Sequence, residues 1–363
     1  MYKLFFICLN KMLLFVGGKH MKIFIYSDLH ISRTSSILPN SLDSMYSYRQ
    51  QMVLDTGKFL STVIAQETPD IIVNCGDTFD QSTITSYDVH TASQFFRCFE
   101  QFNIPHYVLV GNHDMVNSYY NAVTLLDNIP NIKVISTPTS IQTVQGLKLA
   151  FLPYCNYEDI LQFPEGQILF SHQDIQGSII RGDFALPNGI AQEQLKQYNV
   201  VFNGHIHKPS IINNIVNVGS VTTHSFSDDN NFIPQCYVYD TETGNLKTIK
   251  LNICPLFRKL NVTTLEELKS SINNLQSNYT YITQVTCPFE IKDEVKQYLT
   301  QNQNILNFRI LTKVNNITES TVQDTSNVEI NTNIDVKKSF ESFLDTVDLK
   351  VPKDIYLSVL EEI

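Results

Sequence analysis

Five short stretches of this sequence carry Asp, Asn and His side chains, and each follows a short apolar run. Such carboxylate, amide and imidazole groups are donors that divalent metals of hard to borderline character take. Two metals about 3.5–4 Å apart can clamp a phosphate and ionise a water between them. The pattern therefore predicts a bimetal phosphoester hydrolase, with its ligands in Ser27-Asp28-Leu29-His30, Gly76-Asp77, Gly111-Asn112-His113-Asp114, Ser171-His172 and Gly204-His205-Ile206-His207.

The spacing of the donors suggests how two metals would share them. Asp28 and His30 are separated by one residue, so both can point the same way at a strand end. Asp77 follows a glycine, which lets the backbone turn sharply, and its two oxygens can bridge two cations. We predict that the first metal binds Asp28, His30, Asp77 and His207, and that the second binds Asp77, Asn112, His172 and His205.

A general acid is also predicted beside these ligands. His113 directly follows Asn112 and cannot easily bind the same metal, so we expect it to face the substrate and protonate the leaving oxygen, with Asp114 orienting it. Histidine suits this task because its side chain generally titrates near neutral pH. Asp80 either supports the ligands from behind or is an ordinary turn residue. The remaining histidines are expected to lie outside the site: His20, His90, His106 and His224.

Singly, the motifs are weak evidence. Asp-x-His arises by chance, Gly and Asp are ordinary turn residues, and His172 could be a buried polar residue satisfied by hydrogen bonds. Gly-Asn-His-Asp and Gly-His-x-His after strands are more specific. All of them in this order, each after a strand, leave little room for a purely structural explanation.

The apolar runs predict the elements that would position these residues. Strands, helices and strands alternate from residue 22 to residue 110, and the polar motifs follow the carboxyl ends of strands, where open α/β sheets bind ligands. Closer strands follow as far as about residue 251. We therefore expect residues 21–252 to form one α/β sandwich domain. The expected helices span residues 42–64 and 89–102, and the later strands span 133–135, 141–144, 147–152, 168–170, 200–202, 211–218 and 236–239.

Three further segments are predicted after this domain. Residues 255–313 suit a small α+β domain, in which Thr264 and Glu267 have capping-box spacing at a helix start. Residues 314–334 are rich in Asn, Thr and Ser, as in a linker. Residues 335–363 form two amphipathic stretches, each too short to be a stable helix alone. These helices either fold back onto the chain or dock into a partner's groove.

Composition bounds the class of protein. The 363 residues are 43% hydrophobic and 17% charged, which favours two or three folded domains over disorder. The net charge of −10 argues against unspecific nucleic-acid binding, although bound metals would supply local positive charge. Seven scattered cysteines are typical of reduced thiols, so we expect a cytoplasmic protein.

The first 20 residues need a separate interpretation. Two apolar runs in residues 1–20 resemble a signal peptide, but Asn10 and Lys11 interrupt them and no small-x-small cleavage site follows. We expect an over-extended or disordered start, with Met21 as the natural first residue. No run reaches the roughly 18 apolar residues of a membrane span, so no membrane partner is expected.

Over about residues 21–210 the motifs resemble the calcineurin-like metallophosphoesterase superfamily. Gly76-Asp77-Thr78-Phe79-Asp80, and Val218-Gly219-Ser220 followed by Ser225-Phe226, are similar to its nuclease branch, the SbcD-type exonuclease subunit of bacteria and phages. The resemblance implies a metallophosphoesterase β-sandwich flanked by helices, a small capping domain and a helical tail. The ligand roles would belong to Asp28, His30, Asp77, Asn112, His172, His205 and His207, and the acid role to His113.

The same resemblance implies a function. The expected protein is a manganese-dependent DNA exo/endonuclease, acting on double-stranded ends and single strands in end processing, recombination, repair or phage replication. It would work with an SbcC-type coiled-coil ATPase bound through residues 335–363, and the resemblance also implies a homodimer. Two alternatives stay open: a stand-alone phosphomonoesterase, cyclic-nucleotide phosphodiesterase or protein phosphatase on the same core, and a non-catalytic DNA-end-binding scaffold.

Overall fold

The structure is a computed structural model that describes residues 20–33, 46–117, 120–160, 162–181, 184–226 and 232–313. Contacts divide the chain into one unit that ends at Val314 and a second unit, Asn315–Ile363. All described residues belong to the first unit. The predictions for residues 1–19, the linker over 314–334 and the helices over 335–363 lie outside the described residues.

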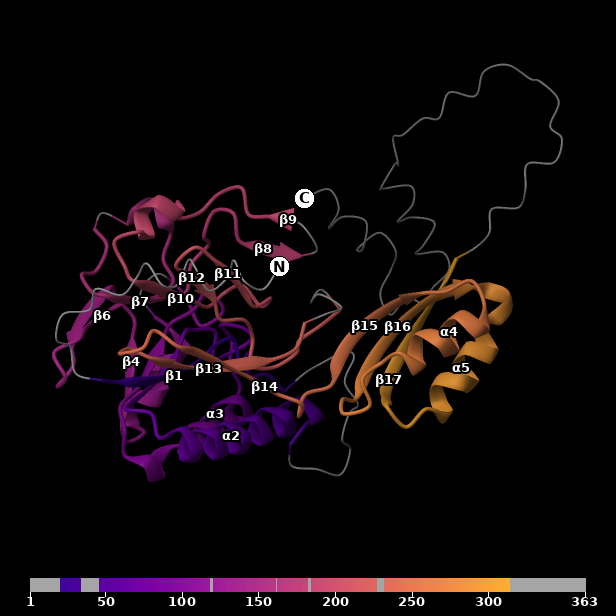
Figure 1. The fold of residues 1–363 in the computed structure, drawn as a ribbon. Coiled ribbons are helices and arrows are strands. Elements are labelled where there is room, and N and C mark those ends of the chain that lie inside the picture. Colours follow the sequence, from indigo (N-terminus) through magenta and orange to yellow (C-terminus); the bar gives the residue numbers. More distant parts are fainter. Residues whose placement is uncertain are drawn as a thin grey trace, which may run out of the picture. The chain divides into compact units, whose positions relative to one another are not determined.

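Two six-stranded sheets form the larger part of the described fold (Figure 1). The first has the order β14-β13-β1-β2-β3-β4, and only β13 runs against the others. The second has the order β11-β12-β10-β7-β6-β5, with a parallel centre and an antiparallel strand at each edge. The first sheet contains β1 (Lys22–Tyr26), β2 (Ile71–Asn74), β3 (His106–Leu109), β4 (Ile132–Ile135), β13 (Gln235–Asp240) and β14 (Leu246–Lys250). The second contains β5 (Thr139–Gln142), β6 (Lys148–Leu152), β7 (Ile168–Ser171), β10 (Val200–Asn203), β11 (Ser210–Ile212) and β12 (Ile215–Asn217).

The sheets pack against each other because their strands are apolar on both faces. In β1, Ile23 and Ile25 join Phe170 and Phe202 of the second sheet in one buried cluster. The alternate residues Phe24 and Tyr26 face the other way, into a cluster shared with the flanking helices. This two-residue period is the normal geometry of a strand. The chain thus has the α/β sandwich with flanking helices that the sequence predicted.

Two helices cover the outer face of the first sheet, α2 (Tyr48–Glu67) and α3 (Ser86–Arg97) (Figure 1). The helix α2 begins later, and α3 earlier, than the hydrophobic pattern predicts, because capping boxes fix their first turns. Ser47 and Gln50 exchange side-chain to backbone hydrogen bonds at the start of α2. Thr85 and Asp88 do the same for α3. The second helix also ends early, and residues 100–102 form the short 3-10 turn η1 (Glu100–Phe102).

Shorter elements complete the sandwich domain. The run 211–218 was predicted as one strand, but it forms β11 and β12, because Asn213 turns the chain with a φ of +55°. In the sequence between β7 and β10, the short antiparallel strands β8 (Ile179–Arg181) and β9 (Phe184–Ala185) form a small hairpin. The remaining 3-10 turns are η2 (Ala122–Asn128), η3 (Tyr157–Asp159) and η4 (Gln192–Leu195).

A separate three-stranded parallel sheet follows, in the order β15-β16-β17. The helices α4 and α5 cover one of its faces and share its apolar core (Figure 1). At the start of α4, the Thr264 hydroxyl accepts the Glu267 amide, but the Glu267 carboxylate accepts from Thr263. These elements are β15 (Leu256–Asn261), α4 (Leu265–Asn273), β16 (Tyr281–Pro288), η5 (Phe289–Ile291), α5 (Lys292–Gln301) and β17 (Ile305–Lys313).

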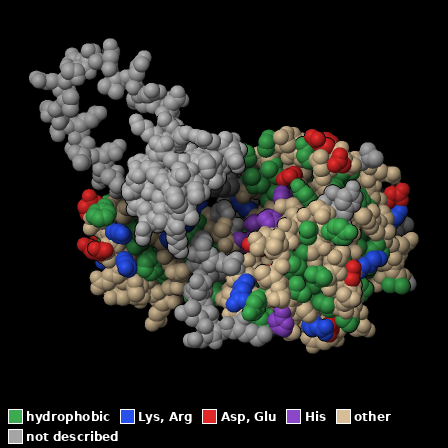
Figure 2. Space-filling view, turned by 180° about the vertical axis from the view of Figure 1, so that it is seen from behind, with side chains coloured by type: hydrophobic (Ala, Val, Ile, Leu, Met, Phe, Trp, Pro, Cys, Tyr) green, Lys and Arg blue, Asp and Glu red, His purple; other side chains and the backbone are tan. Residues whose placement is uncertain are grey.

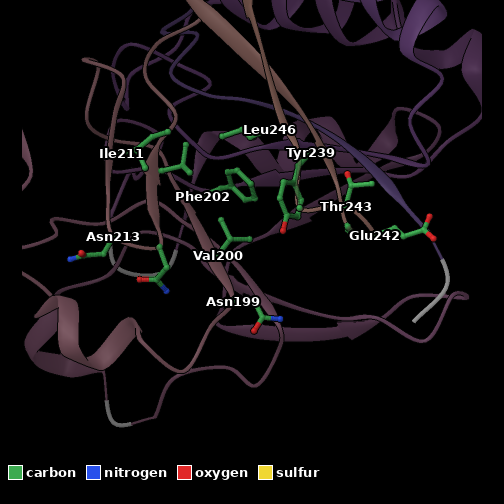
Figure 3. Close-up of a pocket in the computed structure, with 13 residues that line it drawn as sticks. Asn199, Val200, Phe202, Ile211, Asn213, Tyr239, Glu242, Thr243 and Leu246 are labelled. Carbon is green, nitrogen blue, oxygen red and sulfur yellow. The ribbon is translucent and has the colours of Figure 1, made fainter. Parts of the chain in front are cut away.

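A largely apolar cavity of about 170 Å³ lies at the amino ends of β10 and β12. Phe202, Tyr239 and Leu246 line it (Figure 3). No predicted metal ligand lines this cavity, since those residues follow the opposite, carboxyl ends of the strands. Among the described residues, no helix has the length and apolar character required to cross a membrane.

Candidate metal centre

The predicted ligands converge because parallel strands of both sheets end level with one another. Tyr26 pairs with Asn74 at the ends of β1 and β2, and Ser171 pairs with Asn203 at the ends of β7 and β10. Each predicted ligand lies in the turn directly beyond one of these strands or beyond β3. A group of histidines reaches the surface together in Figure 2. The sequence could place these residues at strand ends, and the pairing of the strands brings the ends together.

The ligand turns share an unusual backbone conformation. Asp28, His30, Asp77 and His205 have φ values of +56°, +47°, +51° and +71°. This left-handed conformation costs an L-residue roughly 1–2 kcal/mol, and such strain gathers at functional sites. Hydrogen bonds between turns hold it in place: the Asp28 amide donates to Gly76 O at 3.0 Å, and the His30 amide donates to Asp77 O at 3.1 Å.

Two glycines are required for this close approach. Gly76 has a φ of +107°, and a Cβ there would lie 2.3 Å from Nδ1 of His172. A Cβ on Gly111 would lie 2.2 Å from Oδ1 of Asp77. No side chain larger than hydrogen fits at either position without displacing a predicted ligand.

The four predicted ligands of the second metal form one cluster. Nε2 of His172 lies 3.2 Å from Oδ2 of Asp77 and 3.0 Å from Oδ1 of Asn112. Nδ1 of His205 lies 3.0 Å from the same Asn112 oxygen. The other nitrogen of His172 donates to Cys75 O at 2.7 Å, which fixes the ring and directs Nε2 into the cluster. Such a backbone partner is typical of a metal-bound histidine.

The four predicted ligands of the first metal are more widely spread. Nε2 of His30 lies 3.2 Å from Nε2 of His207, 3.5 Å from Oδ2 of Asp77 and 3.8 Å from Oδ1 of Asp28. Asp28 is fully buried, and neither of its carboxylate oxygens has a hydrogen-bond partner among the described residues. A buried carboxylate without a hydrogen bond is strongly unfavourable unless a cation neutralises it. The donor set therefore fits a divalent metal.

Asp77 links the two clusters. Its Oδ2 faces His30 on one side and His172 on the other, while its Oδ1 accepts the backbone amide of His113 at 2.9 Å. A carboxylate placed between two groups of donors is suited to bridging two cations. Both donor groups face Oδ2 alone, whereas the sequence leads us to expect that the two oxygens share the bridge, and the bridging role stays a prediction.

The electrostatics of the site favour positive charge. Burial alone would lower the pKa of an imidazole, but the carboxylates of Asp28, Asp80 and Asp77 raise the pKa of His30 to about 10. Burial likewise opposes the charge on His172, whose pKa the Asp77 and Asp28 carboxylates raise to about 9. The same field that binds a proton attracts a metal cation, which competes with protons for these nitrogens.

Asp80 and His113 lie beside the first cluster. Oδ1 of Asp80 is 3.3 Å from Nδ1 of His30, so this carboxylate supports a predicted ligand from behind. His113 is exposed, its ring packs edge-on against His30 at 4.7 Å, and its Nδ1 donates to Asp80 O at 2.7 Å. Its other nitrogen is thus the one that can face a substrate.

Asp114 does something other than the sequence suggested. Its side chain is fully buried and hydrogen-bonds to backbone amides instead of His113. The carboxylate accepts from Gly111 and Phe79, both at 2.9 Å, and from Thr78 at 3.3 Å. It therefore joins the turn beyond β2 to the turn beyond β3. Residue spacing alone put Asp114 next to His113, but the backbone directs the two side chains to different places.

His224 also departs from expectation, because it lies in the site. Its ring is 4.4 Å from that of His30 and 4.7 Å from that of His207. One of its nitrogens lies within 4.8 Å of a nitrogen of each of the other two rings, but both of its nitrogens are used in hydrogen bonds. Nδ1 accepts from the buried Arg49 guanidinium, so Nε2 carries the proton it shares with Ser220. We therefore regard His224 as a support for the cluster and not as a ligand.

Arg49 is a further residue of the site that the sequence did not indicate. Its guanidinium, on the first turn of α2, donates to the carbonyl oxygens of Leu29, His30 and Thr223. This fixes the backbone of the turn beyond β1 against residues 220–224. An arginine in the first turn of a helix carries no sequence signal for such a role.

The model of the calcineurin-like phosphoesterase family matches residues 21–209, just over half of the chain. The protein therefore belongs to the calcineurin-like phosphoesterase family.

Comparison with individual proteins adds one relative and several structures. "Exonuclease subunit 1" of Enterobacteria phage T4 is 24% identical over 275 residues, which cover 71% of this chain and 76% of the phage protein. The structure of TT1561 from Thermus thermophilus is 10% identical, with a TM-score of 0.39, covering 64% of this chain and 99% of that one. The structure of a dimetal phosphatase from Danio rerio is 11% identical, with a TM-score of 0.35, covering 63% of this chain and 98% of that one. The structure of the nuclease MPE of Pseudomonas putida is 13% identical, with a TM-score of 0.30, covering 62% of this chain and 87% of that one.

Proposed function

We propose that this protein is the catalytic subunit of a metal-dependent DNA exo/endonuclease, which hydrolyses phosphodiester bonds with two divalent cations. The observation that carries the proposal is the position of Asp77, whose Oδ2 lies 3.5 Å from His30 and 3.2 Å from His172, between two clusters of donors. Manganese is the metal we expect. Bound there, the cations would supply positive charge to the phosphodiester and lower the pKa of an attacking water.

The choice of DNA as substrate rests on the phage relative. Its name describes an exonuclease subunit, and its similarity covers 71% of the chain, well beyond the residues that the family model matches. The additional sheet formed by β15, β16 and β17 also favours a nuclease with a second domain over a stand-alone phosphatase.

The protein's own residues would divide the work. The ligand turns hold the donors in a strained, hydrogen-bonded backbone, so the site is organised before the substrate arrives. His113 is exposed, and its Nδ1 donates to Asp80 O. In the doubly protonated ring the second proton is on Nε2, which can pass it to the leaving oxygen and keep the hydrogen on Nδ1. Arg49 would hold the backbone of the turn beyond β1, and Asp114 that of the turn beyond β3.

We further propose an assembly for this subunit. Residues 335–363, which lie outside the described residues, would bind the base of an SbcC-type coiled-coil ATPase, and two copies of the chain would form a homodimer. The apolar positions Val336, Phe340, Phe343, Leu344 and Val347 fall on one face of a predicted helix, which suits helix-in-groove binding. Such a complex would act in the cytoplasm of a bacterium or of a phage-infected cell.

A nuclease assay tests the catalytic part. The full chain would be incubated with Mn²⁺ and end-labelled double-stranded or single-stranded DNA, with and without the ATPase. Asp77→Ala would serve as the inactive control, and p-nitrophenyl phosphate and cyclic AMP as competing substrates. We expect nucleotide release from DNA that depends on Mn²⁺ and Asp77.

Each other outcome identifies an alternative. Turnover of the monoester or the cyclic nucleotide without DNA cleavage would indicate a phosphatase or phosphodiesterase. DNA binding with two tightly bound metals but no cleavage under any condition would indicate a non-catalytic end-binding subunit.

A further inference from the structure

A carboxylate behind His205 carries a further inference. Oδ1 of Asp174 lies 3.0 Å from Nε2 of His205, and a carboxylate oxygen can only accept, so Nε2 carries the hydrogen of the neutral ring. The lone pair is then on Nδ1. That nitrogen lies 3.0 Å from Oδ1 of Asn112, which also can only accept, so in this tautomer two lone pairs face each other in the cluster assigned to the second metal. Such an arrangement suits two donors to one cation, and the Asp174 contact favours it.

Asp174 reaches this position from the segment directly after β7, two residues beyond His172. The His172 ring packs against the His205 ring at 5.3 Å, so both residues contact the same imidazole. The intervening Gln173 is buried and instead donates to Pro153 O at 2.7 Å.

The backbone of Asp174 is held although its side chain is 38% exposed. Its carbonyl oxygen accepts the Ile190 amide at 2.9 Å, and the Gln176 amide donates to Ile190 O at 3.0 Å. Gly189 packs directly against this point with a φ of +124°, and a Cβ there would lie 2.5 Å from Asp174 O. The chain segment that contains β8 and β9 thus packs tightly against the backbone of Asp174.

We propose that Asp174 is a positioning residue of the second metal site, which acts by holding His205 in the tautomer that presents Nδ1. The inference rests on the two-metal centre of the proposed function. A carboxylate that accepts from the outer nitrogen of a metal-binding histidine fixes the ring orientation and makes the inner nitrogen a stronger ligand, and its removal typically weakens metal binding about 10–100-fold.

Manganese binding measured without DNA tests this role. The full-length protein would be freed of metal and titrated with MnCl₂ by calorimetry, with bound manganese counted by mass spectrometry. The variants are Asp174→Ala, the conservative Asp174→Glu, and Asp159→Ala as a control, because Asp159 is an exposed acid in the 3-10 turn η3. Thermal melting of the metal-free proteins would report any loss of folding.

The expected result is specific to one of the two sites. Asp174→Ala should keep the first Mn²⁺ at wild-type affinity and bind the second about 10–100-fold more weakly. Asp174→Glu should recover part of this loss, the control should match wild type, and all melting temperatures should agree. Unchanged binding at both sites in Asp174→Ala, or equal weakening of both, would overturn the proposed role of Asp174 and leave the two-metal centre itself untouched. Fewer than two Mn²⁺ in the wild type would instead refute the two-metal centre of the proposed function.

Discussion

Replacing Asp114 with alanine separates two possible roles of this residue. In the structure the carboxylate joins the turns beyond β2 and β3 through amides of Gly111 and Phe79 at 2.9 Å and Thr78 at 3.3 Å. A hydrogen bond to a charged group contributes about 1.5–3 kcal/mol. Counting the two short bonds at about 2 kcal/mol each gives a loss of about 4 kcal/mol. For a domain of this size, that corresponds to a fall in Tm of roughly 10 °C.

The melting assay is best run at several pH values from 5 to 8. Burial and the neighbouring Asp77 raise the pKa of Asp114 to about 7, so the folded protein loses stability relative to the unfolded chain as the pH rises from about 4 to 7. The loss in Asp114→Ala should therefore be largest at pH 5 and smallest at pH 8, with about 4 kcal/mol as its upper value. Metal binding should weaken together with stability, because Asp77 and Asn112 lie on the two turns that Asp114 joins. Asp88→Ala is the matched control. Asp88 is also buried and caps α3 through Thr85, so its removal should cost about 1 kcal/mol without affecting metal binding.

The contrary result is equally specific. If Asp114→Ala melts like the wild type and keeps both metals but loses at least a hundredfold in kcat, the carboxylate acts through His113. The expectation from the sequence would then hold, and the interpretation of its backbone hydrogen bonds would be wrong.

Four other predictions concern the centre and its partner. His113→Asn should leave metal content and DNA binding near wild type and lower cleavage about 10²–10⁴-fold; a collapse of metal content would make His113 a ligand. Asp77→Ala should lose at least one metal and several orders of magnitude in turnover, and a variant with two tight metals and normal cleavage would remove Asp77 from the bridge. Burial opposes the charge on His30 and His172, but nearby carboxylates raise the pKa of His30 to about 10 and that of His172 to about 9. Mn²⁺ binding should therefore release protons and become tighter as the pH rises from 7 to 9. Calorimetry in buffers of different ionisation enthalpy would measure both effects. Deleting residues 330–363 should keep cleavage of short single strands but abolish co-purification with the ATPase, and unchanged ATPase affinity would show that the tail is not the docking element.

The elements of the fold were largely predictable because their signals are local. The apolar runs that become β1, β2, β7 and β10 are visible in the sequence, and polar residues mark where each ends. The limits of α2 and α3 differ from the hydrophobic pattern, since the capping pairs Ser47–Gln50 and Thr85–Asp88 set their first turns. The run 211–218 is predicted as one strand because apolar residues stand on both sides of Asn213 and Asn214, but the chain turns back at Asn213.

The sequence by itself determined which residue types could bind metals and that they follow strand ends, because donor chemistry and strand period are properties of short segments. The tertiary structure decided what lies behind them. His224, Arg49 and Asp174 come from distant elements, and only the packing of α2, of residues 220–224 and of the chain segment after β7 brings them to the ligands. It also decided that Asp114 accepts from backbone amides and not from its neighbour His113. Adjacent residues point in different directions, and which partner each one meets depends on the chain folded around it.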